Sequence, residues 1–236
     1  MTAAPAFPRP VPPPAAPSWC QVRRWYEGVL GWPTLAAADG EPVRLRTGVR
    51  FDALLLPADA GLAVLRRAPG SGPVALDGRA RRVVFLVAAG SAEELPGLLD
   101  WLEWGGIALD LTALGAGGRI TAPLPGGPPA TPGVAAAPAG AGHGQDGAPV
   151  PGEAVWLRPP EPGREVEPTL PVYGLGGGGG APDLGRLVGT AATEVHRARL
   201  RRARTARSPR PTGGQPLAFS YASRISAGTR PRSLTL

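Results

Sequence analysis

Glycine and proline limit how much of this chain can fold. The sequence has 35 glycines and 31 prolines among 236 residues, more than a quarter of the chain. At that level, disordered or low-complexity segments are expected beside any compact part. Glycine and proline are concentrated in residues 1–17, 124–152 and 159–182, and residues 124–152 are too poor in large apolar side chains to offset the entropy of ordering. We therefore expect one domain over residues 18–158, interrupted by a disordered insert at 124–152.

The segments outside this domain differ in composition. Residues 1–17 are expected to form a proline-rich leader, and residues 159–182 a Gly/Pro linker. Residues 183–236 form a basic tail, partly helical or disordered, in which a helix is expected from Asp183 to about Ala206.

Inside the domain, the residue spacing predicts helices that alternate with short strands. Ser18 can cap a helix that ends at Gly31, and Ser91 with Glu94 three residues later forms a capping box for a helix through Trp104. A further helix is expected over 58–67, and strands over 32–36, 43–46, 51–56, 74–76, 83–87, 107–111, 119–122 and 154–158. This order predicts an α/β (α+β) fold, a small mixed sheet with flanking helices.

Two tryptophans lie on one face of the helix that begins at Ser91. Trp101 and Trp104 are three residues apart, so their side chains project from the same side. Packing in the core is the expectation for both. Exposure would instead mark a surface for a partner.

The net charge of +7 comes from the C-terminal end of the chain. All 25 basic residues are arginine, and none of the 18 acids follows residue 196. A block of like charge binds nucleic acid through counterion release or remains solvated. We expect contacts to DNA or RNA from Arg197, Arg199, Arg201, Arg202, Arg204 and Arg207, and we expect this charge to lie outside the folded domain.

Cysteine usage and the N-terminal residues suggest a compartment. The single cysteine, Cys20, cannot form an internal disulfide, so a reducing, cytoplasmic location is expected. The prolines of residues 1–17 interrupt any long apolar run. We therefore expect no signal peptide and no membrane partner.

Short motifs occur in a recognisable order along residues 18–158. They are Gly31-Trp32-Pro33, Thr47-Gly48, Phe51-Asp52-Ala53-Leu54, Gly61 to Leu65, Asp77-Gly78, Asp110, Gly117-Gly118, Ile120 to Pro123, and the segment VWLRPP at 155–160. This order resembles the N-terminal domain of bacterial bifunctional DNA primase/polymerases, the prim-pol domain of the archaeo-eukaryotic primase class. The resemblance implies a prim-pol-like fold and a role in nucleic-acid metabolism.

The same resemblance implies an incomplete catalytic site. Nucleotidyl transfer needs two divalent ions held by clustered carboxylates. The resemblance places Asp52 at the first acidic position of the family's site and Asp110 at the third. Leu54 stands at the second acidic position, and Arg82 lies near the position of the family's catalytic histidine. Arg82 can still bind a phosphate through two N–H groups. We therefore expect a domain with a degenerate catalytic site and no cofactor. Its expected role is nucleic-acid-associated or regulatory.

Two alternatives stay open. One is an active primase/polymerase, a nucleotidyltransferase that uses magnesium or manganese with Asp52, Asp110 and a further acid such as Asp59 or Asp77. In that case the acids should converge at one end of the sheet. The other is a protein-interaction scaffold, in which the proline-rich segments bind a protein partner.

Overall fold

The computed structural model describes residues 18–35, 38, 41–125, 154–173 and 183–207. Its helices are α1 (Trp19–Gly28), α2 (Ala58–Arg67), α3 (Ser91–Trp101), α4 (Leu184–Arg207) and the short 3₁₀ helix η1 (Glu167–Thr169). Its strands are β1 (Thr34–Leu35), β2 (Arg44–Arg46), β3 (Asp52–Pro57), β4 (Val74–Asp77), β5 (Arg82–Val87), β6 (Thr112–Leu114), β7 (Arg119–Thr121) and β8 (Ala154–Arg158). The expected leader, nearly all of the insert and the tail beyond residue 207 lie outside the described residues.

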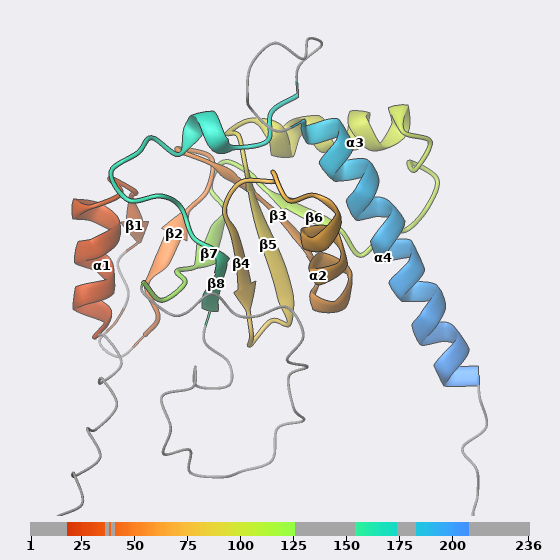
Figure 1. Ribbon diagram of the computed structural model, residues 1–236, viewed down its shortest axis with the longest axis horizontal. Coiled ribbons are helices and arrows are strands. Elements are labelled where there is room, and N and C mark those ends of the chain that lie inside the picture. The colour runs from red at the N-terminus through yellow and green to blue at the C-terminus, as the bar shows by residue number, and fades with distance from the viewer. Residues whose placement is uncertain (1–17, 36–37, 39–40, 126–153, 174–182, 208–236) are drawn as a thin grey trace, which may run out of the picture.

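The described part is a mixed α/β structure, as the sequence predicts. It contains two sheets, and every pair of neighbouring strands in them is antiparallel, so the single mixed sheet that we expected is replaced by two antiparallel ones. Figure 1 shows the smaller sheet beside α1, and the larger sheet between the smaller sheet and helices α2, α3 and α4.

The larger sheet has the strand order β6-β3-β5-β4-β8. Its first four strands occur along the chain as β3-α2-β4-β5-α3-β6, which is the split βαβ arrangement of ferredoxin-like folds. In the central pair, Asp52 is opposite Val87 and Pro57 is opposite Arg82. Asp52 and Arg82 therefore lie at opposite ends of this strand pair.

Helices α2, α3 and α4 lie together beside one face of the larger sheet (Figure 1). Side chains alternate along a strand, so Leu54 and Leu56 of β3 point to the same face, and both are buried in the core that these helices complete. The apolar stripe of α4 belongs to the same core and consists of Leu184, Leu187, Val188, Ala191, Val195 and Ala198. Within the described parts of the chain, no helix is long and apolar enough to cross a membrane.

The folded unit extends past residue 158, the boundary that we expected. The helix expected from Asp183 forms as α4, but it is a packed element of the domain. Residues 159–173, expected to be linker, also pack on the core through Val166 and Leu170, which are 5% and 1% exposed. Leu124, expected to begin the insert, is paired with Val155.

The opposite face of the larger sheet packs against the smaller sheet, of order β1-β2-β7, and against α1. Aromatic residues fill this second core, with Trp32 contacting both Tyr26 and Phe51. The Tyr26 hydroxyl donates a hydrogen bond to the Pro123 carbonyl at 2.7 Å. Burial raises the pKa of Tyr26 well above its usual value, so this side chain remains a donor.

The region around α3 differs from the sequence prediction at both ends. The N-cap is Gly90, whose φ is 91°, and Ser91 is the first residue inside the helix. The predicted capping box therefore does not form, because glycine has no side chain that could bond the first turn. The helix ends at Trp101 rather than Trp104. Residues 107–111, expected to be a strand, precede β6 as an irregular loop. Leu109 and Leu111 pack against the core, and the carbonyls of Ala108 and Asp110 accept hydrogen bonds from Arg199 and Arg82.

Gly61 sets the distance between α2 and the larger sheet. A Cβ at Gly61 would lie 2.3 Å from Cβ of Val83 in β5. We expect Gly61→Ala to lower the free energy of unfolding by about 1–3 kcal/mol through overpacking, measured by urea denaturation. Gly97→Ala is the matched control, since it adds a methyl group within α3 where no atom lies within 4 Å, and it should be neutral or slightly stabilising. Equal effects of the two changes would contradict this packing.

Candidate nucleic-acid interface

Asp52 is buried at the start of β3, where it binds the beginning of α3. Asp52 is 1% exposed, and its Oδ2 accepts a hydrogen bond of 2.9 Å from the backbone N–H of Ala92. The first N–H groups of a helix lack partners within the helix and carry partial positive charge. Asp52 therefore supplies from a neighbouring strand the cap that Gly90 lacks.

Residues of the Thr47-Gly48 and Gly117-Gly118 motifs lie at this end of β3. The Thr47 hydroxyl donates to the carbonyl of Gly115 at 2.6 Å, and the Thr47 N–H donates to the carbonyl of Gly118 at 3.1 Å. A Cβ at Gly48, whose φ is +81°, would lie 2.2 Å from Cα of Ala116. The Thr-Gly and Gly-Gly motifs thus have a packing role, since they hold two turns together.

The capping contact gives Asp52 a testable role in stability. We expect Asp52→Ala to lower the free energy of unfolding by about 1–2 kcal/mol, because the α3 N-terminus loses its acceptor. Asp52→Asn keeps a carbonyl oxygen and should cost less. Chemical denaturation of the two variants beside the parent chain measures both effects. A gain in stability on Asp52→Ala would show that Asp52 is a strained site residue instead.

Asp110 lies beside the other end of β3, in the loop before β6. It precedes β6, in which Thr112 is opposite Leu55 and Leu114 is opposite Ala53, so Asp110 is nearer to the Pro57 end. Its carboxylate is 51% exposed and forms an ion pair of 2.7 Å with Arg82. Because Pro57 and Asp52 are five residues apart, the strand separates the two ends by about 17 Å.

The acids expected to hold metal therefore do not converge. A shared divalent ion, with metal–oxygen bonds near 2.1 Å, needs carboxylate oxygens within about 4–5 Å of each other. Leu54, where the resemblance to primase/polymerases predicts the second acid, is 2% exposed in the core. The alternative acids Asp59 and Asp77 lie near Arg82, since Asp77 is opposite Arg82 and Ala58 bonds to Arg81. Among the described residues, no group of three or more His, Cys, Asp or Glu side chains could hold a metal ion.

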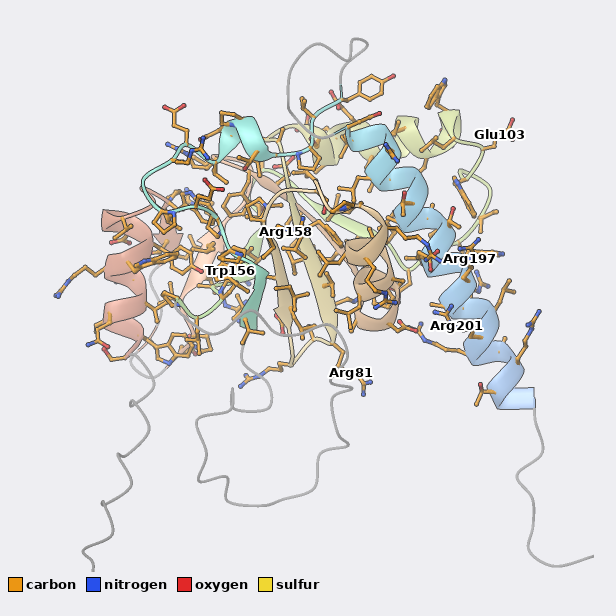
Figure 2. All side chains as sticks on the ribbon, viewed as in Figure 1. Arg81, Glu103, Trp156, Arg158, Arg197 and Arg201 are labelled. Carbon is orange, nitrogen blue, oxygen red and sulfur yellow. The ribbon has the colours of Figure 1, made fainter. Side chains whose placement is uncertain are left out.

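Arginines from both sheets meet where Arg82 lies. A small cavity of about 130 Å³ is lined by Arg44 of β2, Arg82 of β5 and Arg119 of β7. The alternation of β2 explains this, because Leu45 is buried while Arg44 and Arg46 on either side are exposed. The turn between β4 and β5 adds Arg79 and Arg81. Figure 2 shows Arg81 at this end of the hairpin.

These arginines have few anionic neighbours. Within the part of the chain that the structure describes, the side chains of Arg44, Arg46 and Arg119 have no ion pair and no hydrogen bond. Arg46 is directly opposite Arg119, and like charges placed opposite each other on a strand pair are destabilising. A bound anion would relieve that repulsion.

The arginines of α4 are attached to the domain, contrary to the expectation that their charge lies outside it. Arg202 forms an ion pair of 2.5 Å with Asp59 of α2, and Arg199 donates to the Ala108 carbonyl at 2.7 Å. Since Ala108 belongs to the same loop as Asp110, the loop joins the second half of α4 to Arg82. Figure 2 shows Arg197 and Arg201 along α4.

The remaining predicted arginines of α4 are in different situations. Arg197 forms an ion pair of 2.7 Å with Glu194, three residues earlier on the same helix. Arg201 is exposed, and Arg204 is exposed but has an interaction partner. Arg207 is the last residue of α4. The structure thus brings Arg82 together with Arg199 and Arg202, which the sequence had placed in separate regions.

We call this end of the domain the basic rim. It consists of Arg44, Arg79, Arg81, Arg82, Arg119, Arg199 and Arg202, with the acids Asp59, Asp77 and Asp110. Arg44 and Arg119 were not among the site residues predicted from the sequence. A signal was present, because each lies in a three-residue strand with one buried aliphatic residue, and such alternation puts arginine on the outer face. Comparison with models of protein families, with curated proteins and with solved structures finds no match.

Proposed function

We propose that this chain is a primase/polymerase-like domain that has lost nucleotidyl transfer and binds nucleic acid through the basic rim. The observation that carries this proposal is a contrast between two sets of side chains. Arginines from β2, β5, β7 and α4 meet at one end of the domain, whereas the two acids assigned to metal binding lie at opposite ends of β3.

The expected mode of binding is contact with phosphates rather than with bases. Each guanidinium has five N–H donors and matches the geometry of phosphate oxygens. Among the described residues, no group occupies the donors of Arg44 or Arg119, and Arg82 uses some of its donors on Asp110. The cavity lining includes no aromatic side chain, so base stacking is not supported there. Binding through the rim should depend little on base sequence.

A second common mode of binding by split βαβ domains is unsupported here. RNA-recognition domains of this architecture stack bases on aromatic residues of the open sheet face. In this chain, the corresponding face includes Ala53, Val84 and Leu86, which are 0%, 4% and 0% exposed. The smaller sheet and α1 cover it. The rim is therefore the better candidate surface.

The surroundings of Asp52 support the proposed loss of catalysis. Its one bonded oxygen caps α3, and its neighbour on the same strand face, Leu54, is apolar and buried. A two-metal mechanism requires ions about 3.5–4 Å apart, held by several carboxylates. Asp52 by itself does not provide such a set of ligands.

Binding and catalysis can be tested on one preparation of the full chain. We expect a fluorescent single-stranded oligonucleotide to bind, with an affinity that falls steeply as salt rises. Primer extension with magnesium or manganese and all four deoxynucleoside triphosphates should yield no product. Metal-dependent extension that disappears in Asp52→Ala would contradict the loss of catalysis. Absence of oligonucleotide binding at low salt would contradict the binding role and favour the scaffold alternative.

A further inference from the structure

A larger cavity lies between the C-terminal end of α3 and the first half of α4. Its volume is about 740 Å³, which is within the range of about 300–1,000 Å³ typical of small-molecule sites. Arg82, Arg44 and Arg119, which mark the basic rim, do not line it. This cavity is a separate candidate site.

Two aromatic side chains line the cavity and are exposed. Trp101, at the end of α3, is 70% exposed, and Tyr173, at the end of the described range 154–173, is 43% exposed. Trp101 is therefore not in the core, where its spacing with Trp104 predicted it. Large exposed aromatic residues are unusual on a surface without a partner, and they provide flat faces on which a planar ring can stack.

Three arginines line the same cavity. Arg186 has no side-chain partner within the described part of the chain. Arg67 and Arg197 bind the same oxygen, Oε1 of Glu194, at 2.6 and 2.7 Å. About half of each of these two side chains is exposed, and one bond to Glu194 leaves further N–H donors on each guanidinium.

The two acids of the cavity already have partners. Glu194 is 3% exposed and is held by the two arginines. The carboxylate of Asp183 accepts hydrogen bonds from the N–H groups of Gly185 and Arg186 at 2.8 and 3.4 Å. The cavity therefore offers guanidinium donors and aromatic faces, and each of its two carboxylates is bonded through one oxygen.

We propose that this cavity binds a small planar aromatic molecule that carries one anionic group, a carboxylate or a phosphate. The ring stacks on Trp101 or Tyr173, and the anion is bound by Arg186 together with the free donors of Arg67 and Arg197. The lining has three arginines and two acids, so a single anionic group matches its net charge.

Isothermal titration calorimetry with the full chain tests the proposal. The probes are adenosine 5′-monophosphate and indole-3-acetate, beside the uncharged counterparts adenosine and indole and the ring-free counterparts phosphate and acetate. We expect one of the two complete probes to bind at least tenfold more tightly than both of its fragments, and the probe that does so identifies the anionic group. If neither complete probe binds more tightly than its fragments, the proposal is wrong.

Variants locate the binding. Trp101→Ala and Arg186→Gln should each weaken the bound probe about tenfold, which corresponds to the loss of roughly one stacking or charged hydrogen-bond contact. Leu200→Ala on α4 and Arg66→Gln on α2 are the controls, since both residues are exposed and lie outside the lining. The rim variant Arg44→Gln with Arg119→Gln should leave the affinity unchanged, which separates this site from the proposed nucleic-acid interface. Unchanged affinity in Trp101→Ala and Arg186→Gln would overturn the assignment.

Discussion

Replacement of Arg44 and Arg119 by glutamine is expected to weaken the binding of a single-stranded oligonucleotide by about 100-fold at low salt. Both guanidinium groups line the rim cavity, and neither has a partner among the described residues. A hydrogen bond to a charged group contributes about 1.5 kcal/mol or more, and 1.4 kcal/mol is a factor of ten in affinity. Two such contacts therefore account for the expected loss, which fluorescence anisotropy would measure.

The salt dependence gives an independent measure of the same contacts. Each phosphate contact contributes about −0.7 to the slope of log affinity against log salt for a single strand. The double variant should therefore have a slope less steep by about 1.4. The charge-matched control is Arg24→Gln with Arg66→Gln, two exposed arginines on α1 and α2. If the control loses as much affinity as the rim variant, binding follows net charge and not the rim.

Replacement of both Arg67 and Arg197 by methionine is expected to destabilise the fold by about 3 kcal/mol. Glu194 is buried in the interface of α4 with the domain, and these two arginines bind its Oε1. A buried carboxylate that loses its partners costs about 3–5 kcal/mol, and we expect the lower end because both arginines are half exposed. Urea denaturation measures the loss.

A third substitution separates this cause from lost packing. Replacement of buried ion pairs by apolar residues of similar size is often neutral. The triple variant, with Glu194→Met added to the two arginine changes, should therefore recover most of the stability. A triple variant less stable than the double one would show that the ion pairs are not what fixes Glu194 in the core.

The sequence predicts most of the elements because their patterns are local. The helix over 58–67 and the strand over 154–158 have the predicted bounds as α2 and β8. Periodic apolar residues and turn signals determine such elements. The loop 107–111 was predicted as a strand because its residues are largely apolar, but its neighbours are the side chains of Arg82 and Arg199, which come from distant parts of the chain.

The candidate site was less predictable because it depends on strand register. Asp52 and Asp110 fit a motif order, yet the register puts them at opposite ends of β3. The place of α4 was also missed, since its many arginines suggested a solvated tail. Its apolar residues recur every three or four positions, and Glu194 lies on the same stripe. This spacing predicts a packed helix, but the many arginines of the same segment favoured the interpretation of a solvated tail.

Arginine modification would test the central claim most directly. Phenylglyoxal reacts with accessible guanidinium groups, and peptide mass spectrometry can compare each site with and without a bound oligonucleotide. We predict that the oligonucleotide protects Arg44, Arg82 and Arg119, while Arg24 and Arg66 react equally in both samples. Protection confined to the arginines beyond residue 207, with the rim still reactive, would contradict the account.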